Sequence, residues 1–299
     1  AAEAAPMMYG LRSRDQQKKG TNVLFVDESI FPQNLAVIQT RVIPQGMKIQ
    51  VGNYKELEFT PEIFACIIQY PNASGSVEDY REFVEKAHAA NCKVAVDADI
   101  LSLALLLPPG EWGADIVFGS TQRLGIPLFY GGPSAAYFAT RDEYKRNMPG
   151  RIIGLSKDKY GKICYRMALQ TREQHIKREK ATSNICTAQA LLATMAGFYA
   201  VYHGQEGIKN IAKRIHSIAT WLNKALARLG YVQHNEIFFD TLRFSLPDHV
   251  SAQKLRTIAL SKEVNLCYYD NGDVGFSIDE TTDLKDVNLL LSIFSIAAE

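Results

Sequence analysis

The chain has 299 residues, of which 47% are hydrophobic and 22% charged, and its formal net charge is +1. This composition excludes a disordered or collagen-like chain, and the length is enough to bury a sizeable core without disulfides. The near-neutral charge gives no reason to expect a nucleic acid or an anionic membrane as partner, so we expect a small molecule or another protein.

Cysteine usage and hydropathy exclude further classes. The five cysteines are far apart and form no CxxC pair, which predicts reduced buried thiols and neither a disulfide framework nor a metal site. The longest aliphatic stretch, residues 100–107, is too short to span a membrane, and no signal peptide is visible. We therefore expect a cytoplasmic protein, or one of the mitochondrial matrix if the source is eukaryotic. The cysteines are Cys66, Cys92, Cys164, Cys186 and Cys267.

The first residues predict a helix that lacks its beginning. Residues 1–9 are rich in alanine, no N-cap residue precedes them, and there is no initiator methionine. We expect this chain to be part of a longer polypeptide.

From residue 23 onward, short apolar segments alternate with helical patterns. Continuous apolar strands that are bounded by turn residues and separated by helices are typical of a parallel sheet covered on both faces. The first half is therefore expected to be α/β. The predicted strands are 23–29, 48–51, 65–71, 93–99, 114–120 and 135–141, and the predicted helices are 32–40 and 77–90.

The pattern changes after Gly150. A polar, basic stretch runs to Lys180, and an apolar helix over 187–202 follows as a connector. The remaining pattern predicts a compact α+β unit, with helices at 208–229, 251–263 and 283–297 and strands at 238–246, 264–269 and 274–278. We expect a large α/β domain over 1–203 and a small C-terminal α+β domain over 204–299.

Three strand endings could carry chemistry, because ligands of open parallel sheets bind beyond the carboxyl ends of the strands. These are Asp97, the loop 119–125, and the segment 70–72. An Asp at a strand end and a loop 26 residues later form an arrangement that many pyridoxal-phosphate enzymes use, with Asp on the pyridinium nitrogen and a loop Lys as Schiff base. On the other interpretation, Asp97 is a capping or turn residue.

The loop carries Arg123 where that chemistry needs a lysine. A guanidinium stays protonated and does not condense usefully with an aldehyde, so a cofactor loop of this sequence would be disabled. Motifs for dinucleotide binding, P-loop NTPases, zinc proteases and α/β-hydrolases are missing from the sequence, which disfavours those classes.

Three long segments, 108–141, 148–154 and 168–193, and the later motifs FDTLRF and GFSIDET carry a likeness to one known family. They closely resemble the glycine decarboxylase P-protein family of the glycine cleavage system. The likeness covers essentially the whole chain.

The resemblance implies a fold-type I pyridoxal-phosphate fold, similar to aspartate aminotransferase. It implies an enzyme that decarboxylates glycine and transfers the aminomethyl group to the lipoyl H-protein. The long form of the family has two homologous halves, and this chain resembles the N-terminal half. The family's Schiff-base lysine lies in the C-terminal half, in a His-Lys pair that Gln122 and Arg123 replace here.

A vestigial site is therefore expected, with Asp97, Gln122 and Arg123 as its residues and no catalytic residue in this half. A Gly-Thr pair, which in the family precedes the first helix and would cradle a phosphate, is also missing from this sequence. We expect no pyridoxal phosphate on this chain, although the parent enzyme uses it, and no metal. The expected partners are glycine, the H-protein, the C-terminal half of the same enzyme and a second copy in a homodimer.

The basic segment 166–180 has two interpretations. It is a solvated charged surface, or it lies where the two halves meet and supports the working site. A single histidine without a visible partner is more often structural than catalytic. The candidates for the supporting role are Arg172, His175, Lys180, Thr182, Ser183 and Asn184.

Two other functions stay open. The chain could be a catalytically silent scaffold or regulatory module with an aminotransferase fold. An active pyridoxal enzyme of another specificity is disfavoured by Arg123.

Overall fold

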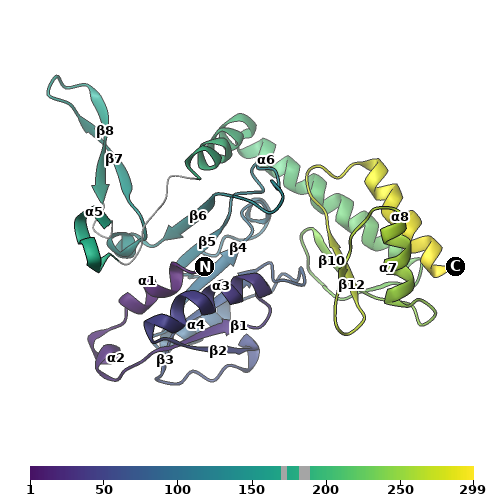
Figure 1. Cartoon of the computed structure of the whole chain (residues 1–299), viewed down its shortest axis with the longest axis horizontal. Helices are drawn as coiled ribbons and strands as arrows, with labels where there is room; N and C mark the ends of the chain where they lie inside the picture. The colour runs from purple at the N-terminus through teal and green to yellow at the C-terminus, as the bar shows by residue number, and fades with distance from the viewer. Residues whose placement is uncertain (170–173, 182–188) are drawn as a thin grey trace. The chain divides into compact units, whose positions relative to one another are not determined.

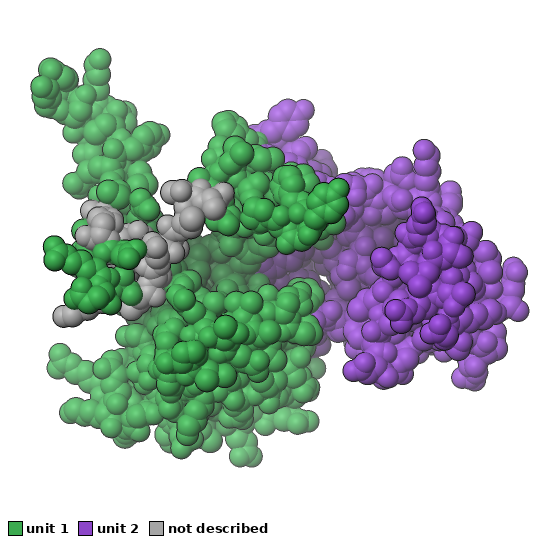
Figure 2. Space-filling model, in the orientation of Figure 1, with its two compact units in different colours: residues 1–68, 80–97, 108–198 green, residues 69–79, 98–107, 199–299 purple. Residues whose placement is uncertain are grey.

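The computed structural model describes residues 1–169, 174–181 and 189–299, and the chain divides into two compact units (Figure 2). The first unit contains residues 1–68, 80–97 and 108–198. The second contains residues 69–79, 98–107 and 199–299. The predicted division after residue 203 places 69–79 and 98–107 in the large domain, whereas they pack within the second unit. Ser76 forms a β-bridge with Phe238, and Leu101 is buried in the core of that unit.

A six-stranded sheet is the main element of the first unit (Figure 1). The strand order is β2-β1-β3-β4-β5-β6. Strand β1 pairs in parallel with β2 and β3, β4 pairs in parallel with β5, and β6 is antiparallel to its neighbour β5. The predicted mostly parallel α/β sheet is confirmed. The strands are β1 (Val23–Asp27), β2 (Lys48–Gly52), β3 (Ile63–Tyr70), β4 (Lys93–Ala98), β5 (Ile116–Ser120) and β6 (Ala136–Thr140).

The strands β1 and β3 are buried along their whole length, because they are continuous apolar runs covered by helices. Met8 and Ile38, from the first and third helices, share one core cluster with Leu24 and Ile67 of these strands. The helices of this unit are α1 (Ala4–Gly10), α2 (Arg14–Lys18), α3 (Pro32–Val42) and α4 (Arg81–Ala89). The short 3-10 helices of the first 150 residues are η1 (Ile43–Gln45), η2 (Tyr54–Glu56), η3 (Ser102–Ala104) and η4 (Asp142–Asn147).

The region predicted as a polar, basic stretch contains an antiparallel hairpin, β7 (Ile152–Lys157) and β8 (Ile163–Leu169). Its sequence alternates apolar with small or polar residues at the period of a strand, which the basic residues obscure. The turn is closed by Asp158, whose Oδ1 accepts hydrogen bonds from the backbone nitrogens of Tyr160 (2.8 Å) and Lys162 (2.9 Å). The short helices α5 (Gln174–Lys177) and η5 (Arg178–Lys180) follow.

The second unit is built on a four-stranded antiparallel sheet of order β11-β12-β10-β9. Helix α6 (Ala190–Ala227) contributes to both units, and Gly204, with φ of 61°, interrupts its helical geometry at the predicted break. The remaining elements are β9 (Val232–Gln233), β10 (Thr241–Ser245), α7 (Ala252–Ser261), β11 (Cys267–Tyr268), β12 (Val274–Ser277) and α8 (Leu284–Ala298).

Aromatic rings form the centre of the second unit. Phe294 of α8 packs edge-on against Tyr231, with ring centroids 5.0 Å apart, and against Phe276, at 5.7 Å. The Tyr231 hydroxyl donates a 2.8 Å hydrogen bond to the carbonyl of Phe294. The polar end of a buried tyrosine is thereby satisfied, so the ring adds apolar burial without leaving an unpaired hydroxyl.

The four cysteines in the described ranges have free thiols. Cys66 and Cys92 are buried as predicted, but Cys267 is exposed, because β11 is a two-residue strand at the edge of its sheet. Cys186 lies outside the described residues. No helix in the part of the chain that the structure describes has both the length and the apolar character needed to cross a bilayer.

Candidate functional site

Asp97 lies near the carboxyl end of β4, where the sequence analysis placed it. Its Oδ2 accepts a 2.5 Å hydrogen bond from the side-chain amide of Asn34, which α3 brings to this edge of the sheet. Burial raises the pKa of Asp97 to about 6, and the Asn34 hydrogen bond acts in the opposite direction. The carboxylate is thus already engaged by a neutral donor within the chain.

The loop after β5 is fixed by its own hydrogen bonds. The backbone nitrogen of Gln122 donates to Oγ of Ser120 at 3.1 Å, and that of Leu124 donates to the carbonyl of Thr121 at 2.9 Å. Arg123 is half-buried in this turn. The backbone is a tight turn at the strand end, so Arg123 occupies an ordered position in the described loop.

Asp27 is a second acidic residue at this edge, which the sequence analysis did not select. It ends β1 and is 1% exposed. Its Oδ1 accepts hydrogen bonds from the backbone nitrogen (2.7 Å) and hydroxyl (2.6 Å) of Ser29, whereas Oδ2 is buried without a hydrogen-bond partner among the described residues. The sequence signal was the Asp that closes an apolar strand two residues before a Ser, which is typical of an Asx turn.

These residues do not fit a bound pyridoxal phosphate. The Schiff base requires a primary amine, and Arg123 supplies a guanidinium. The amide of Asn34 already donates to Oδ2 of Asp97, although a carboxylate has a second acceptor oxygen, so the missing amine at Arg123 is the decisive misfit. No reaction step can therefore be assigned to the cofactor on this chain.

The third predicted strand ending, 70–72, is explained by local structure. The side-chain oxygen of Asn72 accepts hydrogen bonds from the backbone nitrogens of Ser74 and Ser76, both at 3.0 Å, and from the Ser74 hydroxyl at 2.8 Å. An asparagine that accepts three hydrogen bonds from its own turn acts as a turn residue.

The candidates in the basic segment are only partly within the described residues. His175 lies in α5 and Lys180 in η5. The other four, Arg172, Thr182, Ser183 and Asn184, lie outside the described ranges. Their proposed supporting role remains a prediction.

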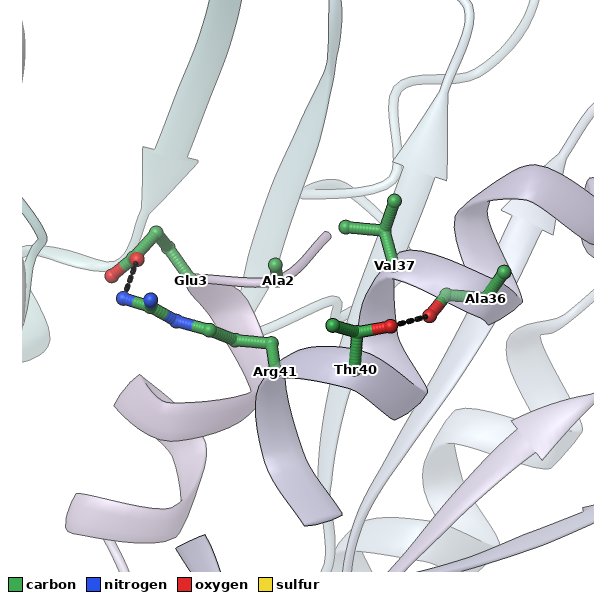
Figure 3. A pocket seen from close by; sticks show the side chains of 6 residues that line it. All are labelled: Ala2, Glu3, Ala36, Val37, Thr40 and Arg41. Atoms are coloured by element: carbon green, nitrogen blue, oxygen red, sulfur yellow. Dashed lines mark hydrogen bonds and ion pairs between the residues drawn. The ribbon is translucent and has the colours of Figure 1, made fainter. Parts of the chain in front are cut away.

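One pocket, of about 540 Å³, lies between the start of α1 and α3 (Figure 3). Its polar groups largely satisfy one another: Arg41 forms an ion pair with Glu3 at 2.7 Å, and the Thr40 hydroxyl donates to the carbonyl of Ala36 at 2.9 Å. Ala2 and Val37 complete the lining, and none of the predicted site residues belongs to it. The pocket therefore presents no reactive group in addition to this ion pair.

Comparison with protein families decides the relationship that the sequence suggested. The profile of the family described as glycine cleavage system P-protein matches residues 1–294. The chain belongs to this family. The resemblance expected from the three long segments is thereby confirmed.

Curated relatives in this family are much longer than the chain. A glycine dehydrogenase (decarboxylating) of Bacteroides fragilis is 78% identical over 298 residues, which are 100% of this chain and 31% of that protein. The enzyme of the same name from Flavobacterium johnsoniae is 54% identical over 297 residues, again 31% of its length. The chain thus spans about a third of the length of these relatives.

Solved structures confirm the fold. One is a crystal structure of glycine decarboxylase (P-protein) of the glycine cleavage system, in inhibitor-bound form, with 28% sequence identity and a TM-score of 0.87. The match covers 99% of this chain and 68% of the chain in that structure. Sphingosine-1-phosphate lyase of Burkholderia pseudomallei gives a TM-score of 0.71 at 12% identity, covering 99% and 67%. The predicted fold-type I, aminotransferase-like fold is therefore correct.

Proposed function

We propose that this chain is the N-terminal, non-catalytic half of a glycine decarboxylase and that it supports a site carried by the rest of the protein. The parent enzyme would use pyridoxal phosphate to decarboxylate glycine and would pass the aminomethyl group to the lipoyl H-protein. Support comes from membership of the P-protein family and from the relatives' name, glycine dehydrogenase (decarboxylating).

The observation that carries the proposal is Arg123 in the turn after β5. In this fold the loop beyond a strand end is where a Schiff-base lysine would be needed, and Arg123 cannot take that role. The hydrogen bond from Asn34 to Asp97 supports the same conclusion, because it gives the carboxylate a partner within the chain. Both features favour a structural role for this half, which would support an active site in the rest of the protein.

The first test is to locate the cofactor in the whole protein. Pyridoxal phosphate is added, the Schiff base is reduced with borohydride, and the adduct is mapped by peptide mass spectrometry. We expect one stoichiometric adduct on a lysine outside these 299 residues. A stoichiometric adduct on a lysine within them would overturn the proposal.

A variant tests whether the missing amine alone disables this half. In the whole protein, Arg123→Lys is expected to yield no second adduct, because a pyridinium would have to compete with the Asn34 amide for the Asp97 carboxylate. The double variant Arg123→Lys with Asn34→Ala is the matched comparison. A full second adduct in the single variant would contradict this account of the site.

A silent scaffold is separated from this proposal by activity. The whole protein with H-protein should exchange labelled carbon dioxide into glycine, and a scaffold should not.

We propose a cytoplasmic location, which the bacterial relatives support. The homodimer stays a prediction.

A further inference from the structure

The hairpin β7–β8 has one apolar face that nothing in the described structure covers. Directly opposed residues share a face, and Ile153 is opposite Met167 while Leu155 is opposite Tyr165. Leu155 is 71% exposed and Tyr165 78%, and Ile163 on the same face is 76% exposed. Beyond the Ile152–Leu169 pair at its base, the other face carries small or polar residues, among them Gly154 opposite Arg166.

A free hairpin of this kind is not expected to be stable in water. Two strands alone are marginal and need a third strand or a packed layer. Within the described residues, β7 and β8 form a sheet of their own, with no further strand. A contiguous apolar face of several large side chains marks an interaction site. Because the fold of the hairpin depends on this cover, the partner is expected to be permanent and not transient.

The tip of the hairpin indicates the charge of that partner. Residues 151–169 contain five basic side chains and a single acidic one, Asp158, whose Oδ1 accepts hydrogen bonds from the turn itself. Lys157, Lys159 and Lys162 surround this turn. A matching surface would be apolar at its centre, with acidic groups toward the tip.

We infer that the apolar face of the hairpin is covered by a segment of the same protein that lies outside these 299 residues. The relatives are about three times as long as this chain, so most of the polypeptide remains to supply it. A segment of the same polypeptide is present at high local concentration, as a permanent partner must be. The inference rests on the proposed function, in which this chain supports the rest of the enzyme. Its test, however, measures a contact and not an activity.

The experiment identifies what touches position 155 in the whole protein, purified without H-protein. The photocrosslinking residue p-benzoylphenylalanine replaces Leu155, and the crosslinked peptide is sequenced by mass spectrometry. The matched control carries the same residue in place of Arg166, on the opposite face. We expect position 155 to crosslink, at least fivefold more efficiently than position 166, to a peptide from outside the 299 residues.

A crosslink from position 155 to a peptide within the 299 residues would identify a second copy or this chain itself and would overturn the inference. Equal, weak crosslinking at both positions would show a free face and would also overturn it.

Hydroxyl-radical footprinting of the unmodified protein guards against a substitution that disturbs folding. Tyr165 should react at least tenfold more slowly in the native protein than in urea, and a ratio below two contradicts a covered face. Loss of glycine exchange activity with an intact crosslink would count against the proposed function alone.

Discussion

The side-chain amide of Asn34 on α3 donates a 2.5 Å hydrogen bond to Oδ2 of Asp97 at the end of β4. Residues that are 63 positions apart thus meet at the carboxyl edge of the sheet. The bond gives a half-buried acid a neutral hydrogen-bond partner from a distant helix. The protonation of Asp97 therefore depends on the folded chain and can be measured.

Asp97 should make stability depend on pH. Burial raises the pKa of Asp97 to about 6, so between about pH 4 and pH 6 the folded protein keeps a proton that the unfolded chain releases. Stability contributed by this group is present below that window and falls as the pH rises through it. Asp97→Asn should raise the free energy of unfolding at pH 7.5 by on the order of 2 kcal/mol, and change it little at pH 3.5.

Urea titrations at the two pH values check this prediction. The exposed Asp15, in a surface ion pair with Lys19, gives the control Asp15→Asn, which should have a small effect at both. An Asp97→Asn effect that is the same at both pH values would contradict the raised pKa.

A second prediction concerns Asp115, which is 1% exposed just before β5. Its Oδ2 accepts a 2.9 Å hydrogen bond from the backbone nitrogen of Val94 and lies 2.9 Å from Nε2 of His88, while Nζ of Lys93 and Nε of Arg141 lie 3.7 Å from Oδ1. Asp115→Ala leaves the buried nitrogen of Val94 unpaired and should cost about 3 kcal/mol.

The comparison variant is His88→Ala, which removes one partly exposed member of the same cluster and should cost about 1 kcal/mol. Chemical denaturation of both proteins at pH 7 measures the difference. A smaller loss for Asp115→Ala than for His88→Ala would show that the carboxylate does not organise this cluster.

Gly75 is a position where no side chain fits. Its φ is +88°, and a Cβ built there would lie 2.5 Å from the carbonyl oxygen of Thr241. Gly75→Ala should therefore destabilise the protein by at least about 3 kcal/mol, because a left-handed backbone and a backbone clash both oppose it. Gly20, with φ of +69° and open space around it, is the matched control, and Gly20→Ala should cost about 1 kcal/mol. Thermal unfolding separates the two, and equal shifts would refute the clash.

Asp273 should stabilise the second unit at neutral pH. Burial alone would raise the pKa of Asp273, but hydrogen bonds from Asn271 and Arg243, together with the nearby His234, hold it below its usual value. With the folded pKa depressed, the stabilisation is present above about pH 4 and lost as the pH falls through the folded pKa. Asp273→Asn should cost about 2 kcal/mol at pH 7 and flatten the loss of stability between pH 5 and pH 2. Unfolding followed by circular dichroism at several pH values tests this prediction. Asp270 is exposed, so the control Asp270→Asn should keep the wild-type dependence of stability on pH.

Local sequence was sufficient for the elements whose pattern is continuous. Strands β1 and β3 could be predicted because they are buried along their length and consist almost entirely of apolar residues. The loop with Arg123 could be selected because chemistry demands a specific side chain there. In both cases one segment carries the whole signal.

Features that depend on distant segments could not be predicted in this way. The amide of Asn34 reaches Asp97 only because α3 packs beside β4, and nothing around either residue indicates it. The hairpin β7–β8 alternates at the period of a strand, but its basic residues made the segment look like a solvated surface, and no further strand pairs with it in the described part of the chain. The site-supporting role of Arg172 and its neighbours stays a prediction.

Leu101 leaves the ribosome more than a hundred residues before Ala212, the next member of its core cluster in chain order. At bacterial rates of synthesis, about 5–20 residues per second, the interval is on the order of ten seconds. During that time the buried partners of Leu101 in the second unit are not yet made, and β5 and β6 of the first unit are still being synthesised. The core of the second unit can therefore close only after α8 has emerged, late in the synthesis of these residues.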